Sequence, residues 1–119
     1  MRAELWPGEE LYEDPALTVF VAEEGEGLVG FLELSLRSYA EGCDSSPVPY
    51  VEGWFVAEAW RRRGVGGALM QAAEEWSRER GFPEMGSDTQ DWNRLSRDAH
   101  AALGFAEVET ITVFRKALL

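Results

Sequence analysis

The stretch "WRRRGVGGAL", from Trp60 to Leu69, runs three arginines directly into a cluster of glycines. Glycine lets the backbone bend sharply and approach a ligand closely. The first N–H groups of a helix that begins here have no intrahelical partner and carry a partial positive charge. With the arginines at its rim, such a turn suits an anion, above all a pyrophosphate. A plain glycine-rich helix start with a solvated basic face fits equally well, so both interpretations stay open.

Two other phosphate-binding motifs fit this turn less well. A P-loop needs G-x-x-x-x-G-K followed by Ser or Thr, and the chain contains no such run. A dinucleotide fingerprint needs a third glycine where Leu69 stands, and its first glycine should follow the strand directly.

A second chemical signal is the carboxylate of Glu52 in "YVEGWFV". Strand alternation predicts that Tyr50, Glu52, Trp54 and Val56 share one half-buried face. A carboxylate is unusual on such a face, which suggests a functional role for Glu52. An aliphatic ammonium cannot act as a nucleophile until it loses a proton, and Glu52 is a candidate base. An exposed strand end is the alternative.

Further polar and aromatic candidates each have a structural alternative. Asp88 can cap a helix, and Glu109 can be a solvated strand residue. Trp6 and Tyr39 can be core aromatics. The chain's single histidine, His100, lies between alanines on a predicted helix, where a structural role is favoured over a catalytic one.

The single cysteine, Cys43, lies in a loop-like run, so the chain has no intrachain disulfide. An inert thiol and a reducing cytoplasmic location are expected.

The hydrophobic pattern predicts the elements that must position these groups. A hairpin of strands is expected at Thr18–Ala22 and Leu28–Leu36, and a third strand at Tyr50–Val56. Apolar residues at helical spacing predict a helix over Val65–Arg80. Its apolar stripe is Val65, Ala68, Leu69, Ala72 and Trp76, with Trp76 in the core.

The second half of the chain continues the alternation of strand and helix. A brief strand is expected at "PEMGS", a helix around Leu95–Leu103 and a late strand at Val108–Phe114. The order of strands and helices predicts one α/β domain over residues 1–119.

The balance of charged residues limits the kinds of partner that the protein can bind. Asp and Glu outnumber Lys and Arg by 22 to 11, which gives a formal net charge of -11. Such a field repels nucleic acid and anionic membranes and favours a cationic partner. No apolar run approaches the roughly 18 residues of a membrane span, and no signal-peptide pattern opens the chain.

The turn matches the pattern Q/R-x-x-G-x-G/A as Arg61-Arg62-Arg63-Gly64-Val65-Gly66. This resembles the coenzyme A turn of the GNAT acetyltransferases. From Leu34 to Lys116, segments such as "SLRSYAEG", "YVEGWFV", "RRRGVGGAL", "HAALGF" and "VFRKAL" resemble the bacterial aminoglycoside 6'-N-acetyltransferases. The resemblance implies the GNAT fold, a central mixed and mostly antiparallel sheet flanked by helices.

The resemblance also implies functional residues. Acetyl-CoA, as cosubstrate, would contact backbone groups of the strand and turn, and no metal is implied. The implied cofactor contacts are Trp54, Phe55, Val56, Arg61, Arg62, Arg63, Gly64, Val65, Gly66, Gly67 and Asn93. The implied aminoglycoside contacts are Trp6, Tyr39, Glu52, Asp88 and Glu109. His100 occupies a place where many members of the family have a tyrosine acid.

One departure from the family concerns the N-terminus. Family members usually begin with a strand and a longer helical stretch, but here Met1 lies only four residues before Leu5-Trp6. The first strand is expected to be missing, or the start to lie further upstream. An uncovered sheet edge and the family's habit of pairing predict a homodimer. Acetylation of another amine, or a non-catalytic acyl-CoA-binding role, stays open as an alternative.

Overall fold

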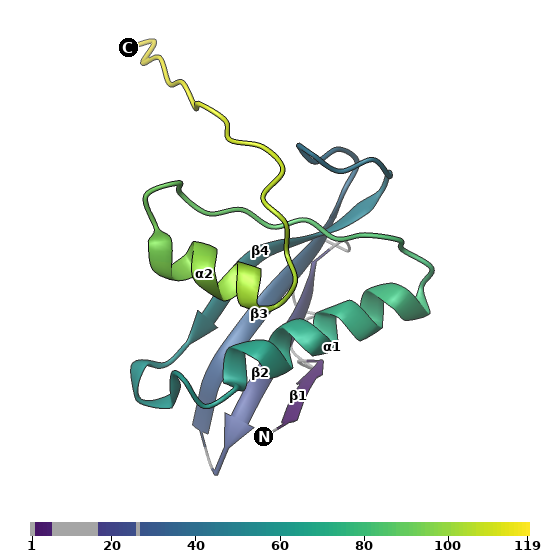
Figure 1. The fold of residues 1–119 in the computed structure, drawn as a ribbon, viewed down its shortest axis with the longest axis vertical. Coiled ribbons are helices and arrows are strands. Elements are labelled where there is room, and N and C mark those ends of the chain that lie inside the picture. The colour runs from purple at the N-terminus through teal and green to yellow at the C-terminus, as the bar shows by residue number, and fades with distance from the viewer. Residues whose placement is uncertain (1, 6–16, 26) are drawn as a thin grey trace. The chain divides into compact units, whose positions relative to one another are not determined.

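The computed structural model describes residues 2–5, 17–25 and 27–119, and it divides into two compact units, Met1–Asp88 and Thr89–Leu119. The first unit contains a four-stranded antiparallel sheet in the order β1-β2-β3-β4 (Figure 1). The strands are β1 (Arg2–Leu5), β2 (Thr18–Glu24), β3 (Gly27–Arg37) and β4 (Val48–Val56). The predicted hairpin and third strand are thus confirmed, each a little longer than expected.

The sheet edge beside β2 is occupied by β1. Leu5 pairs with Phe20, and Arg2 pairs with Glu23. A first strand is therefore present, although it is short. The expectation that this strand is missing is corrected, because residues directly before Trp6 take the edge position.

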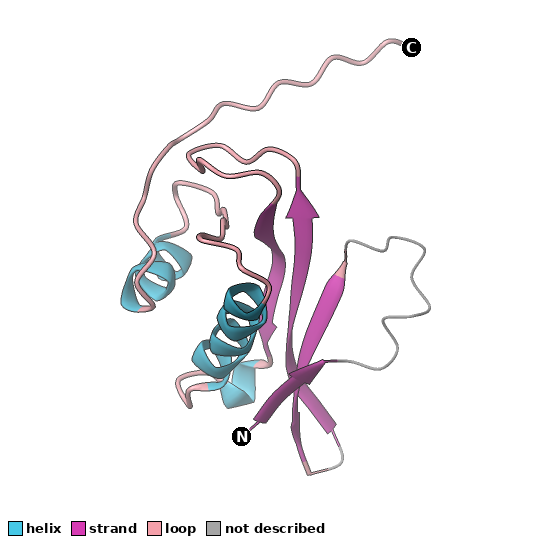
Figure 2. Cartoon of the chain, turned by 90° about the vertical axis from the view of Figure 1, so that its right-hand side faces the viewer, coloured by secondary structure: helices cyan, strands magenta, loops and turns pink. Residues whose placement is uncertain are grey.

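Among the residues that the structure describes, the helix α1 (Val65–Glu79) covers one face of the sheet (Figures 1 and 2). Its buried stripe is Val65, Leu69, Met70, Ala73 and Ser77. A Cβ added to Gly30 of β3 would lie 3.2 Å from Leu69 and 3.3 Å from Val65, so helix and strand are in close contact. Trp76 is not in this core but half-buried, with its ring stacked on Phe82 at 6.3 Å. The helix therefore turns Met70 inward, and the expected stripe through Ala72 and Trp76 is wrong.

The pairing of β3 with β4 contains a β-bulge at Glu52. Glu33 pairs with Gly53 and Leu34 pairs with Val51, which leaves Glu52 as the extra residue. Trp54 lies opposite the fully buried Leu32, on the face that α1 covers.

Beyond the bulge, the alternation of β4 is reversed. Tyr50 lies opposite Ser35, and Glu52 contacts Ser35, so both are on the face turned away from α1. The prediction that Tyr50, Glu52, Trp54 and Val56 share one face is wrong, because the extra residue interrupts the two-residue period.

The segment "PEMGS" forms only one bridge rather than a strand. Gly86 is bridged in parallel to Tyr50, with Val51 N–H donating to Gly86 O and Gly86 N–H donating to Pro49 O, both at 2.9 Å. Pro83 has no N–H to continue a ladder. This bridge is the parallel component of an otherwise antiparallel sheet.

The second unit holds one helix, α2 (Arg94–Ala102), which confirms the second predicted helix. Gly104 follows it with φ of 92°. Arg97 pairs with Glu107 through two hydrogen bonds of 3.0 and 2.9 Å. No strand is present at Val108–Phe114, where Val113 is 82% and Phe114 88% exposed. An alternating pattern forms a strand only beside a partner strand, and within this unit none is available.

Candidate active site

The turn before α1 is built from left-handed backbone conformations. Gly64 is the N-cap residue at φ 82°, and it offers no side-chain cap to the helix. The first helical hydrogen bond joins Ala68 N–H to Gly64 O at 3.0 Å, so the N–H groups of residues 65–67 precede it. Arg62 has φ of 63°, a strained conformation for a residue with a side chain, and such strain clusters at ligand sites. The turn is thus suited to receive an anion.

Trp54 holds this turn from the neighbouring strand. Its indole N–H donates to Gly66 O at 3.1 Å. A Cβ added to Gly66 would lie 3.3 Å from the Trp54 ring, so only glycine fits without displacement. The backbone is therefore fixed in position and bare of side-chain atoms at Gly66.

Two arginines of the turn contact neighbouring residues. Arg61 donates through Nε to Val56 O at 2.9 Å, which connects the turn to the end of β4. The guanidinium of Arg63 lies 4.9 Å from the centre of the Trp60 ring, in the short 3-10 helix η2 (Glu58–Trp60). These cations border a glycine-lined helix start, as a pyrophosphate site requires.

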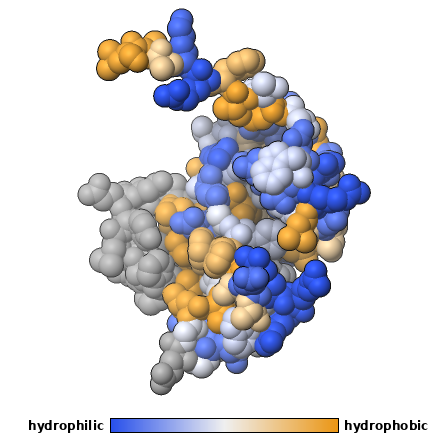
Figure 3. All heavy atoms as spheres, turned by 90° about the vertical axis from the view of Figure 1, so that its left-hand side faces the viewer, coloured by the Kyte–Doolittle hydropathy of each residue, from blue (hydrophilic) through white to orange (hydrophobic). Residues whose placement is uncertain are grey.

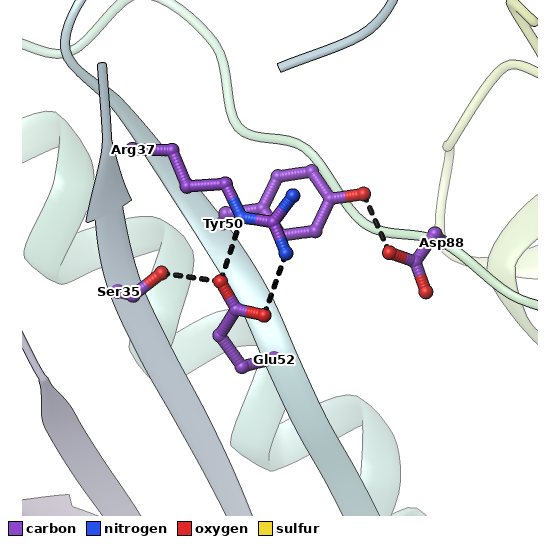
Figure 4. A network of polar contacts seen from close by, with 5 residues as sticks. All are labelled: Ser35, Arg37, Tyr50, Glu52 and Asp88. Atoms are coloured by element: carbon purple, nitrogen blue, oxygen red, sulfur yellow. Dashed lines mark hydrogen bonds and ion pairs between the residues drawn. The ribbon is translucent and has the colours of Figure 1, made fainter. Parts of the chain in front are cut away.

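A polar network lies on the other face of the sheet (Figure 4). Arg37 donates two hydrogen bonds of 2.7 Å to Glu52, from Nε to Oε2 and from Nη2 to Oε1. Ser35 donates its hydroxyl to Oε2 at 2.6 Å. The Arg37 guanidinium lies 3.6 Å from the centre of the Tyr50 ring. Tyr50 in turn donates its hydroxyl to Asp88 at 2.7 Å.

The network determines the charge state of its members. The hydrogen bond from Arg37 holds the pKa of Glu52 below its ordinary value, against an opposing effect of burial and with help from Ser35. Burial, followed by the hydrogen bond to Asp88, raises the pKa of the Tyr50 hydroxyl, which therefore remains a donor. Glu52 is ionised at neutral pH. A carboxylate that is paired in this way is a weaker proton acceptor than an unpaired one.

The structure joins two of the predicted site residues, Glu52 and Asp88, through side chains that the sequence did not single out for this role. Arg37 and Ser35 lie on β3 and reach Glu52 across the strands. The only sequence signal for them is their alternation on one face of β3, which becomes meaningful once the register with β4 is known. Asp88 does not cap a helix as the alternative supposed, because α2 begins at Arg94.

The remaining predicted residues of the first unit are less connected. Tyr39 follows β3 and is 70% exposed. Phe55 is exposed on β4 and stacks on Phe31, with ring centres 5.7 Å apart. Trp6 lies outside the described residues.

Cys43 is held in a loop that Glu84 secures. One carboxylate oxygen of Glu84 accepts hydrogen bonds from Asp44 N–H, Ser45 N–H and the Ser45 hydroxyl, at 2.6–2.8 Å. Burial is the first cause that raises the pKa of the Cys43 thiol, and Glu84 adds to it. The thiol is thus protonated at neutral pH, which supports an inert role.

The second unit carries three predicted site residues. Asn93 is the N-cap of α2, and its Oδ1 accepts from Ser96 N–H at 3.0 Å. His100 Nδ1 lies 2.7 Å from Ser96 O, and its ring meets Phe105 edge-on at 5.2 Å. Glu109 is exposed. Asn93 and His100 therefore have structural contacts that the sequence did not reveal.

The face of the molecule drawn in Figure 3 mixes apolar and polar residues. The exposed large apolar residues of β3 and β4 include Leu28, Phe31 and Phe55. Within the part of the chain that the structure describes, no cluster of His, Cys, Asp or Glu has the arrangement of a metal site. In the same residues no helix has both the length and the apolar character needed to cross a bilayer.

A glycine-lined helix start beside one strand, with charged side chains on the opposite face of that strand, points to a group-transfer enzyme. Residues 2–105 match the family model described as "Acetyltransferase (GNAT) family". The chain therefore belongs to the GNAT acetyltransferases, and the predicted resemblance and fold are confirmed.

Relatives with known names are similar over almost the whole chain. An aminoglycoside N(6')-acetyltransferase type 1 of Klebsiella aerogenes is 46% identical over 133 residues, covering 99% of this chain and 87% of the relative. The solved structure of aminoglycoside acetyltransferase AAC(6')-Iy, bound to a bisubstrate analogue, has a TM-score of 0.84 at 41% identity, covering 92% of this chain and 76% of that one. AAC(6')-Ih from Acinetobacter baumannii has a TM-score of 0.81 at 31% identity, covering 96% and 85%.

Proposed function

We propose that this protein transfers the acetyl group of acetyl-CoA to the 6'-amine of an aminoglycoside and so gives resistance to it. The observation that carries the proposal is that β4 contributes functional residues on both of its faces. Trp54 holds the glycine turn on one face, while the bulge at Glu52 turns a paired carboxylate to the other. Relatives that are 46% and 39% identical over nearly the whole chain carry the same activity in their names.

The cofactor side works mainly through backbone groups. The N–H groups at the start of α1, bordered by residues 61–63, would hold the pyrophosphate of acetyl-CoA. Backbone groups of residues 54–56 would hold the rest of the cofactor, and Asn93 would contact its pantetheine arm. An N–H near Val56 would stabilise the charge that develops on the thioester oxygen. The leaving thiolate needs little help, because thiols ionise near pH 8.5.

The acceptor side works through side chains. Glu52 would lie nearest the 6'-ammonium and accept its proton, directly or through a water, while Asp88 and Glu109 bind other ammonium groups. Trp6 and Tyr39 would pack on sugar faces, and His100 would supply the acid. Because exposed ion pairs contribute only about 0–1 kcal/mol each, several must act together.

The proposal also covers the oligomeric state and the location of the enzyme. One catalytic domain of residues 1–119 would pair into a homodimer in the cytoplasm, without nucleic acid or membrane as partners. The short edge strand β1, four residues beside the seven of β2, and the exposed Tyr39 support pairing. Light scattering at micromolar concentration should give the dimer mass, and a monomer mass would reject it.

A thiol-release assay with acetyl-CoA and a panel of amines tests the activity. Kanamycin-like aminoglycosides should react faster than simple polyamines. Equal rates would favour an enzyme for another amine. No thiol release with any amine, from folded protein that binds acetyl-CoA, would favour a non-catalytic module.

A further inference from the structure

Arg37 connects the two carboxylates of the network although it is itself a cation. Its Nε and Nη2 hold both oxygens of Glu52, and its guanidinium covers the ring of Tyr50 at 3.6 Å. Tyr50 is only 5% exposed and passes the connection on to Asp88 through its hydroxyl. The planar fork of an arginine can do both at once, because its edge donates in parallel while its face stacks on a ring.

By charge alone, Arg37 is unfavourable at a site for a cationic substrate. A positive charge beside Glu52 weakens the attraction of that carboxylate for an ammonium group. A lysine would provide the same charge without the fork or the flat face. The reason for an arginine at this position is therefore geometric.

We propose that Arg37 is a positioning residue of the acceptor site, whose guanidinium fixes Glu52 and, through the Tyr50 ring, Asp88 in one arrangement that receives the acceptor amine. This inference rests on the proposed aminoglycoside activity. It assigns to β3 a role in the orientation of the substrate, since Arg37 acts through its neighbours and not on the reacting atoms.

The test compares Arg37→Lys with Arg37→Met. If geometry matters, both variants lower kcat with the aminoglycoside roughly tenfold or more, because small misplacements of a reacting group are costly. KM for acetyl-CoA should change less than about twofold, since the turn lies on the other face. If Arg37 acts only through its charge, Arg37→Lys keeps the wild-type kcat and Arg37→Met binds the drug more tightly, which would overturn the proposal.

A matched control is Arg78→Met on α1, where the arginine forms a solvent-exposed pair with Glu74 at 3.6 Å. This variant should leave kcat unchanged. Equal losses in kcat, in affinity for acetyl-CoA and in melting temperature for the Arg37 variants would instead show a merely structural role. Arg37→Lys keeps the long side chain, so it serves if Arg37→Met does not fold.

A measurement without turnover separates this proposal from the proposed function. The Nε–H signal of Arg37 in a proton–nitrogen spectrum should be visible and protected at neutral pH, and its protection should fall in Glu52→Gln. An unprotected signal in the wild type would overturn the positioning role, whatever the enzyme acetylates. Absence of drug acetylation with a protected signal would reject the function alone.

Discussion

The turn before α1 and the network around Glu52 are built in opposite ways, although β4 serves both. The turn presents backbone N–H groups. Its key residues are glycines, whose lack of a side chain leaves the backbone accessible. The network presents charged side chains that come from β3, β4 and the segment that ends at Asp88. A backbone site depends on steric freedom at single positions. A side-chain site depends on the register of strands and on charge pairs.

This contrast predicts different responses to mutation. Damage to the turn should come from any added side chain or negative charge and affect acetyl-CoA alone. Damage to the network should depend on both charge and side-chain geometry, and it should be graded and sensitive to pH and salt.

The largest effect is expected from Gly66→Glu, which should abolish acetyl-CoA binding in calorimetry. A Cβ at this position already meets the Trp54 ring at 3.3 Å, and the added negative charge repels a pyrophosphate. Gly27→Glu is the matched control, because a Cβ there meets nothing within 4 Å. Unchanged affinity in a folded Gly66→Glu protein would show that the pyrophosphate binds elsewhere.

Glu52→Gln should come next, with a loss in kcat of roughly 10²-fold or more if Glu52 is the base. The amide keeps the shape of the side chain but cannot accept the proton of the amine. Glu75→Gln, an exposed change on α1, should be silent. Retention of full kcat in Glu52→Gln would remove the base assignment, and a rise in KM alone would leave Glu52 as an anchor for the ammonium.

Asp88→Asn should have a smaller effect and act on binding. Its loss of one charge should raise KM for the drug by roughly two- to fivefold and leave KM for acetyl-CoA nearly unchanged. Rising salt should also raise KM for the drug, more steeply in the wild type than in the variant. Asp98→Asn on α2 is the charge-matched control. A variant that changes both Michaelis constants alike would argue against an acceptor-side role for Asp88.

The smallest effect concerns the stability of the fold. The pKa of Glu52 is lowered in the folded protein, so its stabilisation is present above the unfolded pKa and is lost as the pH falls through the folded one. Glu52→Gln should lower the melting temperature by about 3 °C at pH 7, since such pairs contribute little. The difference should shrink as the pH falls below the unfolded pKa of Glu52 and vanish below the folded one. A difference that grows on acidification would contradict the assignment of the pair.

The turn could be predicted from the sequence because its signal is local. Gly64, Gly66 and the three arginines are adjacent in the chain, and the helix pattern that follows defines their setting. The hairpin and both helices were predicted for the same reason. Local spacing is sufficient where backbone geometry alone makes the site.

The network could not be predicted, because it depends on one extra residue in β4. Alternation places Glu52 beside Trp54, whereas the bulge places it beside Ser35 and Arg37. The prediction of a late strand at Val108–Phe114 was wrong for a related reason, since an alternating pattern does not specify a partner strand. Asn93 and His100 were assigned by resemblance, which carries no information about their contacts within α2.

The bulge at Glu52 also determines which kinds of mutation β4 can tolerate. Most single replacements leave the phase of the strand intact, so their effects stay local. Removal of one residue at the bulge would restore regular pairing and rotate everything on one side of it by half a turn. Either Tyr50 would then point at α1 or Trp54 would point away from the turn. In this strand, a deletion that makes the sheet more regular would separate the halves of the enzyme that β4 now joins.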